Sequence, residues 1–373
     1  MLDSNTPAKP IVPTAGKTIL SGSDVDTGTT AKALLLGIDL GTSRSSVVSY
    51  NGTRKTVETY VGFPKDAVSR KFLKQDVVFG KAALDNRLAL DLYRPLEAGV
   101  IKGSEEANND PTRRDKNLNA AKLLLKHLVD LASPGRDEMI FGVVGVPSRA
   151  TQKNKQAILE MSRQVLDSVM IVSEPFTVAY GMDKMADILV IDIGAGTTDL
   201  CRMHGTVPTD EDEISYTIAG DAIDAKLMEN ILSKYPRAQI TQNMCKTIKE
   251  QYGFVSDNKD RVIVTVPVDG KPTQHDITDE VRNAYELLVG PCVEGIAKLV
   301  STFNPEFQEK LRQNVLLSGG GGLMRGLNTR IEQAMKEYGG ARVTVVDEPL
   351  YAGANGALQL AVDMPGEYWQ QLR

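Results

Sequence analysis

One stretch of the sequence reads Ile188-Leu189-Val190-Ile191-Asp192-Ile193-Gly194-Ala195-Gly196-Thr197-Thr198-Asp199, an apolar run that meets an aspartate and then turns through glycine and threonine. A second stretch, Leu34-Leu35-Leu36-Gly37-Ile38-Asp39-Leu40-Gly41-Thr42-Ser43, repeats this pattern nearer the N-terminus. Each is typical of a β-strand ending at a Gly-rich turn, where glycines accept positive φ values and backbone N–H groups can bind an anion. One such turn is weak evidence, but two imply related half-domains that close on one polyphosphate ligand.

The composition indicates an ordinary globular protein that is long enough for two domains. The chain has 373 residues, of which 42% are hydrophobic and 24% charged. Its net charge of −5 argues against nucleic-acid binding, and its three scattered cysteines argue against a disulfide framework or a zinc site. No apolar run reaches the ~20 residues of a membrane span, and the N-terminus has no secretory signal pattern. We therefore expect a cytoplasmic protein with no nucleic-acid partner and no direct membrane insertion.

The predicted elements are ordered as half, insertion, half, insertion. We expect a disordered tail over 1–32, because that segment is rich in Thr, Ser, Pro and Gly and has little hydrophobic periodicity. The first half is expected to comprise 33–56, 99–185 and 346–373, with an insertion over 57–98. The second half is expected to comprise 186–219 and 281–345, with an insertion over 220–280.

Hydrophobic periodicity predicts the main elements of the α/β body. The strand–helix–strand succession from Met139 to Leu200 favours a largely parallel, helix-covered sheet. The predicted helices are Asn117–Leu131, Thr151–Leu166, Asp221–Ser233, Glu280–Phe303 and Gly353–Val362, and the predicted strands include Met139–Val146, Val169–Val172 and Val315–Leu317.

The two aspartates are candidate metal ligands. If the halves are related by rough two-fold symmetry, Asp39 and Asp192 face each other across a cleft at the carboxyl ends of strands, where open α/β sheets bind ligands. Two close carboxylates repel unless a cation lies between them, and Mg²⁺ suits one or two carboxylates plus phosphate oxygens. Hydroxyl donors stand beside the backbone amides at Thr42, Ser43, Thr197 and Thr198. The alternative is a pair of plain hairpins with capping aspartates.

A third Gly-rich segment, Ser318–Gly322, follows a predicted strand. Its four glycines, Gly319, Gly320, Gly321 and Gly322, leave room for a flat ring or a phosphate against the main chain. A flexible loop is the alternative interpretation.

Glu174 is the candidate catalytic residue, and it stands between a predicted strand and a helix, directly before Pro175. A carboxylate fixed there near a terminal phosphate could orient or deprotonate an attacking water, because positioning supplies most of the catalysis in phosphoryl transfer. The alternative is a first-turn glutamate that the helix dipole favours.

Together these motifs resemble the actin/Hsp70/sugar-kinase superfamily. Gly37–Ser43 resembles its first phosphate loop, Asp192–Asp199 the second, Val143–Pro147 the first connecting segment, Leu316–Gly322 the adenosine loop and Tyr351–Leu360 the second connecting helix. The resemblance implies an actin-like ATPase fold in class α/β, with two related RNase H-like halves, a small insertion subdomain in each, and a nucleotide cleft between them.

Within the superfamily, the chain is similar to bacterial actins, and in particular to the actin-like filament proteins of magnetotactic bacteria. The similarity lies in Ser173–Phe176, Gly62–Asp66, Lys249–Gln251 and the ending Tyr368–Leu372. It implies that Glu174 and Asp192 act in ATP hydrolysis and that Asp39 and Asp192 organise Mg²⁺. The implied ATP/ADP contacts are Asp39, Gly41, Thr42, Ser43, Asp192, Gly194, Ala195, Gly196, Thr197, Thr198, Lys249 and Gly319 to Gly322.

One position departs from the pattern of those relatives. They carry a glutamate three residues before the ribose-contacting lysine, whereas this chain has Lys246 three residues before Lys249. We therefore expect the ribose contacts to differ here.

The resemblance implies a cytoskeletal ATPase that polymerises head-to-tail with copies of itself and turns its filaments over by hydrolysing ATP. Expected partners are further copies of the chain, a paralogous actin-like protein and magnetosome-associated proteins, and the expected role is the positioning of magnetosomes. Two other readings use the same scaffold: a small-molecule kinase or organelle-segregation ATPase, and a chaperone-like switch. The last is disfavoured because the chain stops at Arg373, directly after the last predicted helix.

Overall fold

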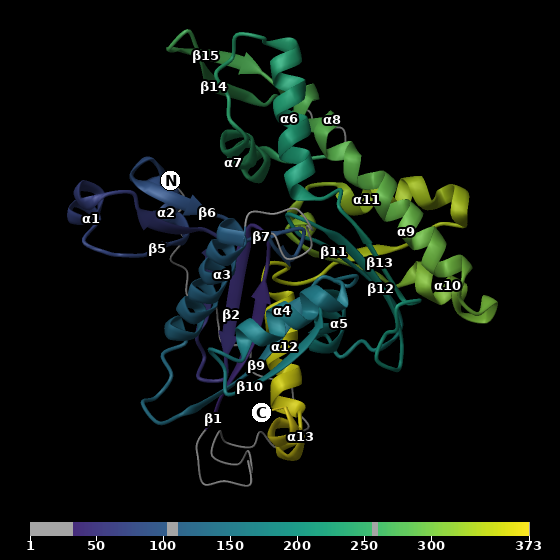
Figure 1. The fold of residues 1–373 in the computed structure, drawn as a ribbon. Helices are drawn as coiled ribbons and strands as arrows, with labels where there is room; N and C mark the ends of the chain where they lie inside the picture. Colours follow the sequence, from purple (N-terminus) through teal and green to yellow (C-terminus); the bar gives the residue numbers. More distant parts are fainter. Residues whose placement is uncertain (1–32, 103–110, 256–259, 373) are drawn as a thin grey trace.

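The computed structural model describes residues 33–102, 111–255 and 260–372 and shows two α/β halves, each with its own insertion (Figure 1). The tail expected over 1–32 lies outside the described residues. The first half is built on a sheet with the order β10-β9-β1-β2-β3. Its strands are β1 (Ala33–Leu40), β2 (Arg44–Ser49), β3 (Arg54–Glu58), β9 (Met139–Val146) and β10 (Ser168–Ser173).

The second half repeats this arrangement with the sheet order β17-β16-β11-β12-β13. In both sheets the central strand is parallel to the two strands on one side, while the strands on the other side form an antiparallel meander. The strands are β11 (Ala186–Ile193), β12 (Thr198–His204), β13 (Glu213–Tyr216), β16 (Val315–Gly319) and β17 (Val343–Val345). The two halves are thus related, as the sequence predicted.

The expectation of one largely parallel sheet from Met139 to Leu200 is wrong. Strands β9 and β10 are parallel within the first sheet, but β11 is the central strand of the second sheet. The helix α5 (Glu174–Gly181) therefore crosses between sheets and does not return the chain to the same one. Each sheet is mixed because its first strands are joined by short turns: in the first sheet, Asn51-Gly52 turns the chain from β2 into β3, with Gly52 at φ +91°.

The first insertion is a small three-stranded sheet with short helices, shown on the left of Figure 1. Its elements are β4 (Val61–Pro64), α1 (Ala67–Leu73), β5 (Val78–Phe79), α2 (Gly80–Asp85), η1 (Arg87–Ala89) and β6 (Leu90–Tyr93), followed by the hairpin β7 (Leu96–Glu97) and β8 (Val100–Ile101).

The second insertion packs helices against a hairpin at the top of Figure 1. Its elements are α6 (Gly220–Lys234), α7 (Gln242–Tyr252), β14 (Ile263–Val268), β15 (Lys271–Asp276) and α8 (Thr278–Tyr285). The subdomain boundaries given above remain our proposal.

The long helix predicted over Glu280–Phe303 is divided. It consists of α8, the 3₁₀ turn η2 (Glu286–Leu288) and α9 (Val289–Ser301). Pro291 explains the break, because it has no N–H to continue the hydrogen-bond ladder from the preceding turn and suits only the first turn of a new helix.

The remaining helices cover the two sheets. They are α3 (Pro111–Leu131), α4 (Gln152–Ser162), α10 (Pro305–Gln313), η3 (Gly320–Leu323), α11 (Leu327–Ala334), η4 (Met335–Tyr338), α12 (Ala352–Asp363) and α13 (Gly366–Gln371). Thr151 caps α4 through its side chain, and after the glycine run α11 lies between the 3₁₀ turns η3 and η4. No helix in these described segments is both long and apolar enough to cross a bilayer.

Helix α12 fixes the geometry beneath the cleft by packing without intervening side chains. A Cβ added at Gly356 would lie 1.7 Å from the carbonyl oxygen of Thr177 on α5, and one at Gly37 would lie 2.1 Å from the carbonyl oxygen of Ala354. Backbone therefore contacts backbone at both places, which locks α5 and β1 to one helix. These two elements carry Glu174 and Asp39.

We predict that Gly356→Ala lowers the free energy of unfolding by about 1–3 kcal/mol, because the added methyl overlaps a main-chain oxygen that cannot move aside. The matched control is Gly290→Ala in α9, where an added Cβ meets nothing within 4 Å. That control should be neutral or stabilising by up to about 1 kcal/mol. Urea unfolding of both variants measures the difference, and equal effects would contradict the packing argument.

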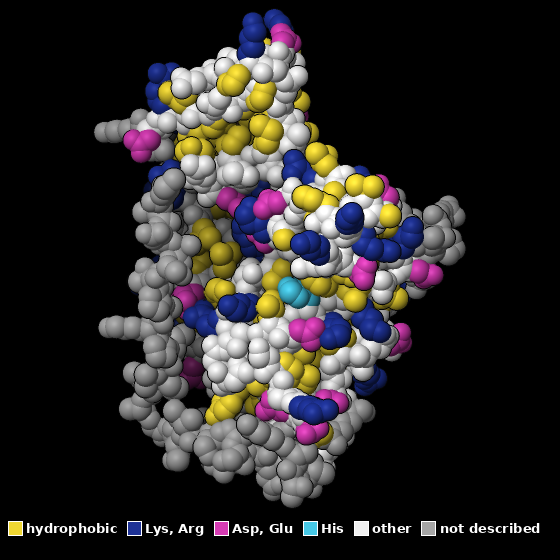
Figure 2. Space-filling model, turned by 90° about the vertical axis from the view of Figure 1, so that its left-hand side faces the viewer, with side chains coloured by type: hydrophobic (Ala, Val, Ile, Leu, Met, Phe, Trp, Pro, Cys, Tyr) yellow, Lys and Arg dark blue, Asp and Glu magenta, His cyan; other side chains and the backbone are white. Residues whose placement is uncertain are grey.

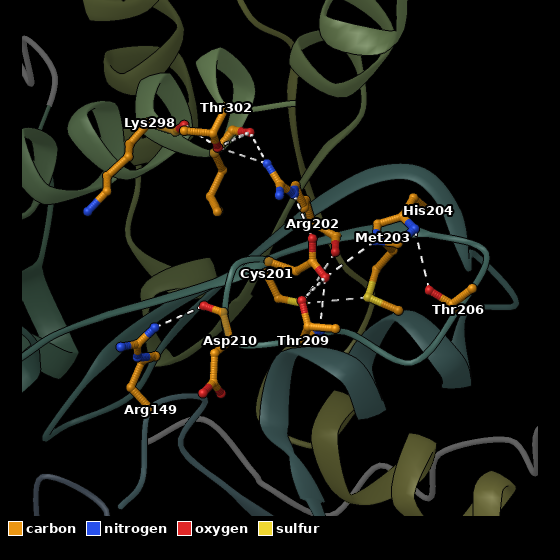
Figure 3. Close-up of polar contacts among 12 residues, drawn as sticks. Arg149, Cys201, Arg202, Met203, His204, Thr206, Thr209, Asp210, Lys298 and Thr302 are labelled. Carbon is orange, nitrogen blue, oxygen red and sulfur yellow. Dashed lines mark hydrogen bonds and ion pairs between the residues drawn. The ribbon is translucent and has the colours of Figure 1, made fainter. Parts of the chain in front are cut away.

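A buried ion pair holds the base of the second half together (Figure 3). Arg202 Nε donates to Asp212 Oδ1 at 2.7 Å, and its Nη1 donates to Thr302 Oγ1 at 2.9 Å. Burial alone would raise the pKa of Asp212, but hydrogen bonds from Thr209 and Arg202 lower it to about 2. The pair thus joins β12, the loop before β13 and the end of α9.

We predict that the protein loses stability as the pH falls from about 4 toward 2, because the carboxylate of Asp212 is stabilised only in the folded state. Its contribution is complete above the unfolded pKa near 4 and disappears as the pH passes through the folded pKa of about 2. Chemical unfolding between pH 5 and 3 measures this slope. Asp212→Asn should show a shallower slope than the parent chain, and an unchanged slope would contradict the assignment.

Candidate functional site

A cleft with a volume of about 640 Å³ lies between the two halves and is bordered by the second insertion. This size is within the usual range for small-molecule sites. Of the residues predicted for the site, those that line the cleft are Asp39, Gly41, Thr42, Ser43, Glu174, Asp192, Gly194, Ala195, Gly196, Thr197, Lys249, Gly319 and Gly320. The structure thus brings segments from opposite ends of the sequence to one cavity.

The two Gly-rich turns touch each other across the floor of the cleft. A Cβ added at Gly196 would lie 2.5 Å from Thr42 Oγ1 and 2.7 Å from the Cα of Ala98. Thr42 Oγ1 in turn accepts a hydrogen bond from the backbone N–H of Gly99 at 3.1 Å. In the second turn, the N–H of Gly194 donates to the carbonyl of Thr197 at 2.9 Å. Only glycine at 196 allows this approach, which explains the residue.

Asp39 and Asp192 occupy equivalent places, since each is the second-last residue of a central strand. Burial raises the pKa of Asp39 to about 6. Burial, together with the charges of Asp39 and Asp199, raises the pKa of Asp192 to about 8. A buried carboxylate whose pKa is raised by a neighbouring carboxylate forms a site that a cation stabilises.

The donor set fits Mg²⁺ held together with phosphate. Within 33–102, 111–255 and 260–372, no group of three or more His, Cys, Asp or Glu side chains is placed to hold a metal ion. Mg²⁺ usually retains several waters and takes one or two carboxylates plus substrate phosphates. Asp39 and Asp192 supply such a partial set, so the fit depends on a bound phosphate chain.

Glu174 begins α5, and its side chain is buried beside the two aspartates. Burial raises the pKa of Glu174 well above its usual range, and the charges of Asp39 and Asp192 add to this effect. A Cβ added at Gly145 on β9 would lie 3.2 Å from Glu174 Cγ. The Glu174 side chain therefore packs against Gly145, where β9 has no side chain. A bound cation would favour the ionised form of Glu174, which can accept a proton from water.

Asp199 is a buried carboxylate near the site that sequence reasoning left out as a site residue. Its Oδ1 accepts a hydrogen bond from the backbone N–H of Ser148 at 3.2 Å, which joins the two halves. Burial raises the pKa of Asp199 to about 6, although hydrogen bonds from Thr197 and Ser215 oppose the increase. Its place at the end of the second motif is the signal that could have indicated it.

Three of the predicted residues, Thr198, Gly321 and Gly322, do not line the cleft. Thr198 Oγ1 donates to the carbonyl of Ile218 at 2.8 Å inside the second sheet. A Cβ added at Gly321 would lie 2.4 Å from Ile193 Cβ, and one at Gly322 would lie 2.9 Å from Pro349 Cβ. Gly321 and Gly322 therefore allow close packing of the loop. Of the four glycines in the run, Gly319 and Gly320 line the cleft.

Helix α7 supplies charged side chains to the upper wall of the cleft. Lys249 Nζ is held by its own subdomain, at 2.7 Å from Asp224 Oδ1 and 2.6 Å from the carbonyl of Gly220. Lys246 and Glu250, spaced by four residues, reach instead to the first half. Helical spacing is the signal for this shared face.

The cleft is also lined by residues that no motif indicated, among them Gly253, Tyr285, Met324, Arg325, Pro349 and Leu350. They come from four separate segments, namely the end of α7, helix α8, the loop after η3 and the loop before α12, so no local sequence pattern unites them. Their apolar and aromatic character suits a flat heterocyclic ring.

Comparisons with known proteins agree with this geometry. The family model for MreB/Mbl proteins matches residues 33–366. The actin-like protein MamK of Paramagnetospirillum magneticum is 39% identical over 345 residues, which cover 92% of this chain and 97% of that protein. The solved MamK double helical filament is similar with a TM-score of 0.84 at 38% identity and covers 89% of this chain and 100% of its own. A non-polymerising MamK mutant bound to AMPPNP gives a TM-score of 0.67 at 38% identity and covers 88% and 98%. The predicted actin-like fold is confirmed.

We predict that Gly319→Ala abolishes or strongly weakens ligand binding in the cleft. Gly319 has φ +69°, and an added Cβ would lie 2.6 Å from Asp192 Oδ1. The matched control is Gly270→Ala, which shares the positive φ of +75° but has nothing within 4 Å. Calorimetric titration with Mg²⁺–ATP compares the two variants. If Gly319→Ala binds as well as the control, then Gly319 does not fix the cleft carboxylate.

Proposed function

The chain belongs to the MreB/Mbl protein family, and on that basis we propose that it is an actin-like ATPase that binds Mg²⁺–ATP, polymerises head-to-tail and hydrolyses ATP to turn its filaments over. The observation that carries the proposal is the facing pair of matched turns, each with an aspartate at its base, on the floor of one cleft. Such a pair suits a polyphosphate with a divalent cation far better than it suits an uncharged substrate.

In this proposal, different groups of cleft residues bind the phosphates, hold the metal ion and activate the attacking water. Backbone N–H groups of the two turns bind the phosphates, while Asp39 and Asp192 hold the magnesium ion, which neutralises charge on the phosphates when bound. Glu174 orients the attacking water and accepts its proton. The reaction breaks the bond to the terminal phosphate and releases ADP and inorganic phosphate.

Binding is coupled to the arrangement of the four subdomains by contacts across the cleft. Arg94 on the first insertion lies 2.8 Å from Asp221 on α6. Arg44 after the first turn lies 2.7 Å from Glu250 on α7. A ligand that contacts both halves favours the closed arrangement in which these pairs form. In this way the occupied cleft sets the surfaces that meet the next subunit.

Self-association is supported by exposed apolar side chains on the first insertion. Val68 and Phe72, four residues apart on α1, are 78% and 71% exposed, and Leu88 on η1 is 87% exposed. Such clustered exposure is typical of an interaction site. One face of the molecule also shows basic and acidic side chains interspersed with apolar groups (Figure 2). A contact between two different faces repeats without closing and yields an open filament.

The location and cargo in this proposal follow from the resemblance to filament proteins of magnetotactic bacteria. We place the filament in the cytoplasm alongside the magnetosome chain, where it positions these organelles. Beyond copies of itself, the partners are a paralogous actin-like protein and magnetosome-associated proteins. Fluorescence microscopy of the tagged protein in its host tests the location, and a diffuse signal with an unchanged organelle arrangement after deletion would contradict it.

We predict that Glu174→Ala leaves ATP binding intact but slows phosphate release by roughly 100-fold or more, because a positioned base contributes that much to proton transfer. Filaments formed with ATP should persist longer. Phosphate release, calorimetry, and pelleting with ATP, ADP or no nucleotide measure the three effects. The matched control is Glu160→Ala, an exposed glutamate on α4. Normal turnover by Glu174→Ala refutes its role, and turnover that needs an added acceptor would indicate a kinase.

We predict that Phe72→Asp raises the critical concentration for polymerisation, because a buried, unpaired carboxylate in a subunit contact is strongly unfavourable. ATP affinity should stay unchanged, since α1 does not line the cleft. Light scattering and pelleting over a concentration series measure the effect. Unaltered assembly would show that the apolar face of α1 lies outside the filament contact.

A further inference from the structure

We propose that Lys246 is a phosphate-binding residue that reaches across the cleft from the second insertion and gives the site an affinity for the charge of a nucleoside di- or triphosphate. This inference rests on the proposed function, because it assumes that the cleft takes a nucleotide. It assigns to Lys246 a different ligand atom from the ribose hydroxyls that the neighbouring lysine position suggested.

Helix α7 directs its two lysines, Lys246 and Lys249, to different partners. Lys249 is fully engaged within the second insertion by Asp224 and the carbonyl of Gly220. Lys246 instead extends to the first half, where its Nζ donates to Ser43 Oγ at 2.6 Å. Ser43 belongs to the first Gly-rich turn, so the ammonium group lies at the phosphate end of the cleft.

Most cations around the cleft have an acidic partner among the described residues, but Lys246 does not. Arg44 pairs with Glu250, Arg94 with Asp221 and Lys249 with Asp224. In the part of the chain that the structure describes, no ion pair includes Lys246, and its closest acceptor is a neutral hydroxyl. Buried or half-buried charges are normally paired, so this ammonium group is suited to an anionic ligand.

The environment of the Lys246 ammonium group favours contact with an anion over its hydrogen bond to Ser43 Oγ. Burial lowers the pKa of Lys246, and the nearby charges of Arg44, Arg94 and Lys249 lower it further, while Glu250 opposes them. A phosphate oxygen removes this penalty because it replaces a neutral acceptor by a charged one, and charge-assisted hydrogen bonds are the stronger class. The backbone amides of the adjacent turn point to the same anion.

A phosphate bound to Lys246 would also connect the second insertion to the first half of the molecule. The residue belongs to the second insertion, whereas Ser43 and the first turn belong to the first half. A phosphate held by both therefore draws the insertion onto the first half and adds to the two cross-cleft ion pairs. A nucleoside without phosphates has no group to make this contact.

The test is calorimetric titration of the full chain with Mg²⁺–ATP, Mg²⁺–ADP and adenosine. Lys246→Met keeps the aliphatic stem and removes the charge, so it should weaken ATP and ADP binding by about 10- to 100-fold, the range for a hydrogen bond to a charged group. Its adenosine affinity should stay that of the parent chain. Lys246→Arg should recover part of the ATP affinity, and added salt should weaken ATP binding more steeply in the parent than in Lys246→Met.

The matched control is Lys271→Met, which removes an exposed lysine of the same insertion on β15. It should bind all three ligands like the parent chain, and thermal unfolding of each variant verifies that it is folded. If the parent chain binds no ATP, the proposed function fails. If the parent binds ATP and Lys246→Met binds ATP and ADP equally well, or loses adenosine to the same extent, the phosphate contact is refuted while the proposed function stands.

Discussion

Repulsion among buried carboxylates at the base of the cleft is the constraint on which this structure depends. Burial raises the pKa values of Asp39, Asp192 and Glu174. The charge of Asp39 raises those of Asp192 and Glu174 further. Such an arrangement is unfavourable for folding, and a bound cation would offset the repulsion. The surrounding fold must therefore be rigid enough to hold like charges together before the ligand arrives.

The repeated sheet and the glycine contacts supply this rigidity. Because both sheets have the same strand order, their central strands deliver Asp39 and Asp192 to equivalent positions. Helix α12 then packs main chain against main chain on both α5 and β1, the elements that carry Glu174 and Asp39. Main-chain contacts of this kind cannot relax by changing a rotamer, so the carboxylates cannot separate without the helix moving.

Local sequence patterns predicted the parts of the site that are local in the chain. The turns at Asp39 and Asp192, the start of α5 and strand β9 follow from glycine, proline and apolar runs within a few residues. The inward packing of Gly321 and Gly322 and the contact from Lys246 to Ser43 depend on partners far along the chain. No local pattern specifies such contacts, and the passage of the chain through α5 from the first sheet to the second was missed for the same reason.

The two kinds of contact at the cleft have different consequences for motion. The floor is made of close backbone packing, which is stiff. Polar side-chain pairs such as Arg94 with Asp221 and Arg44 with Glu250 connect the upper walls. Partly exposed ion pairs contribute little net free energy, so they can break and form without threatening the fold. A ligand bound on the floor can thus change the arrangement of the walls if it binds the closed arrangement slightly more tightly than the open one. An assembly controlled by a nucleotide requires this property.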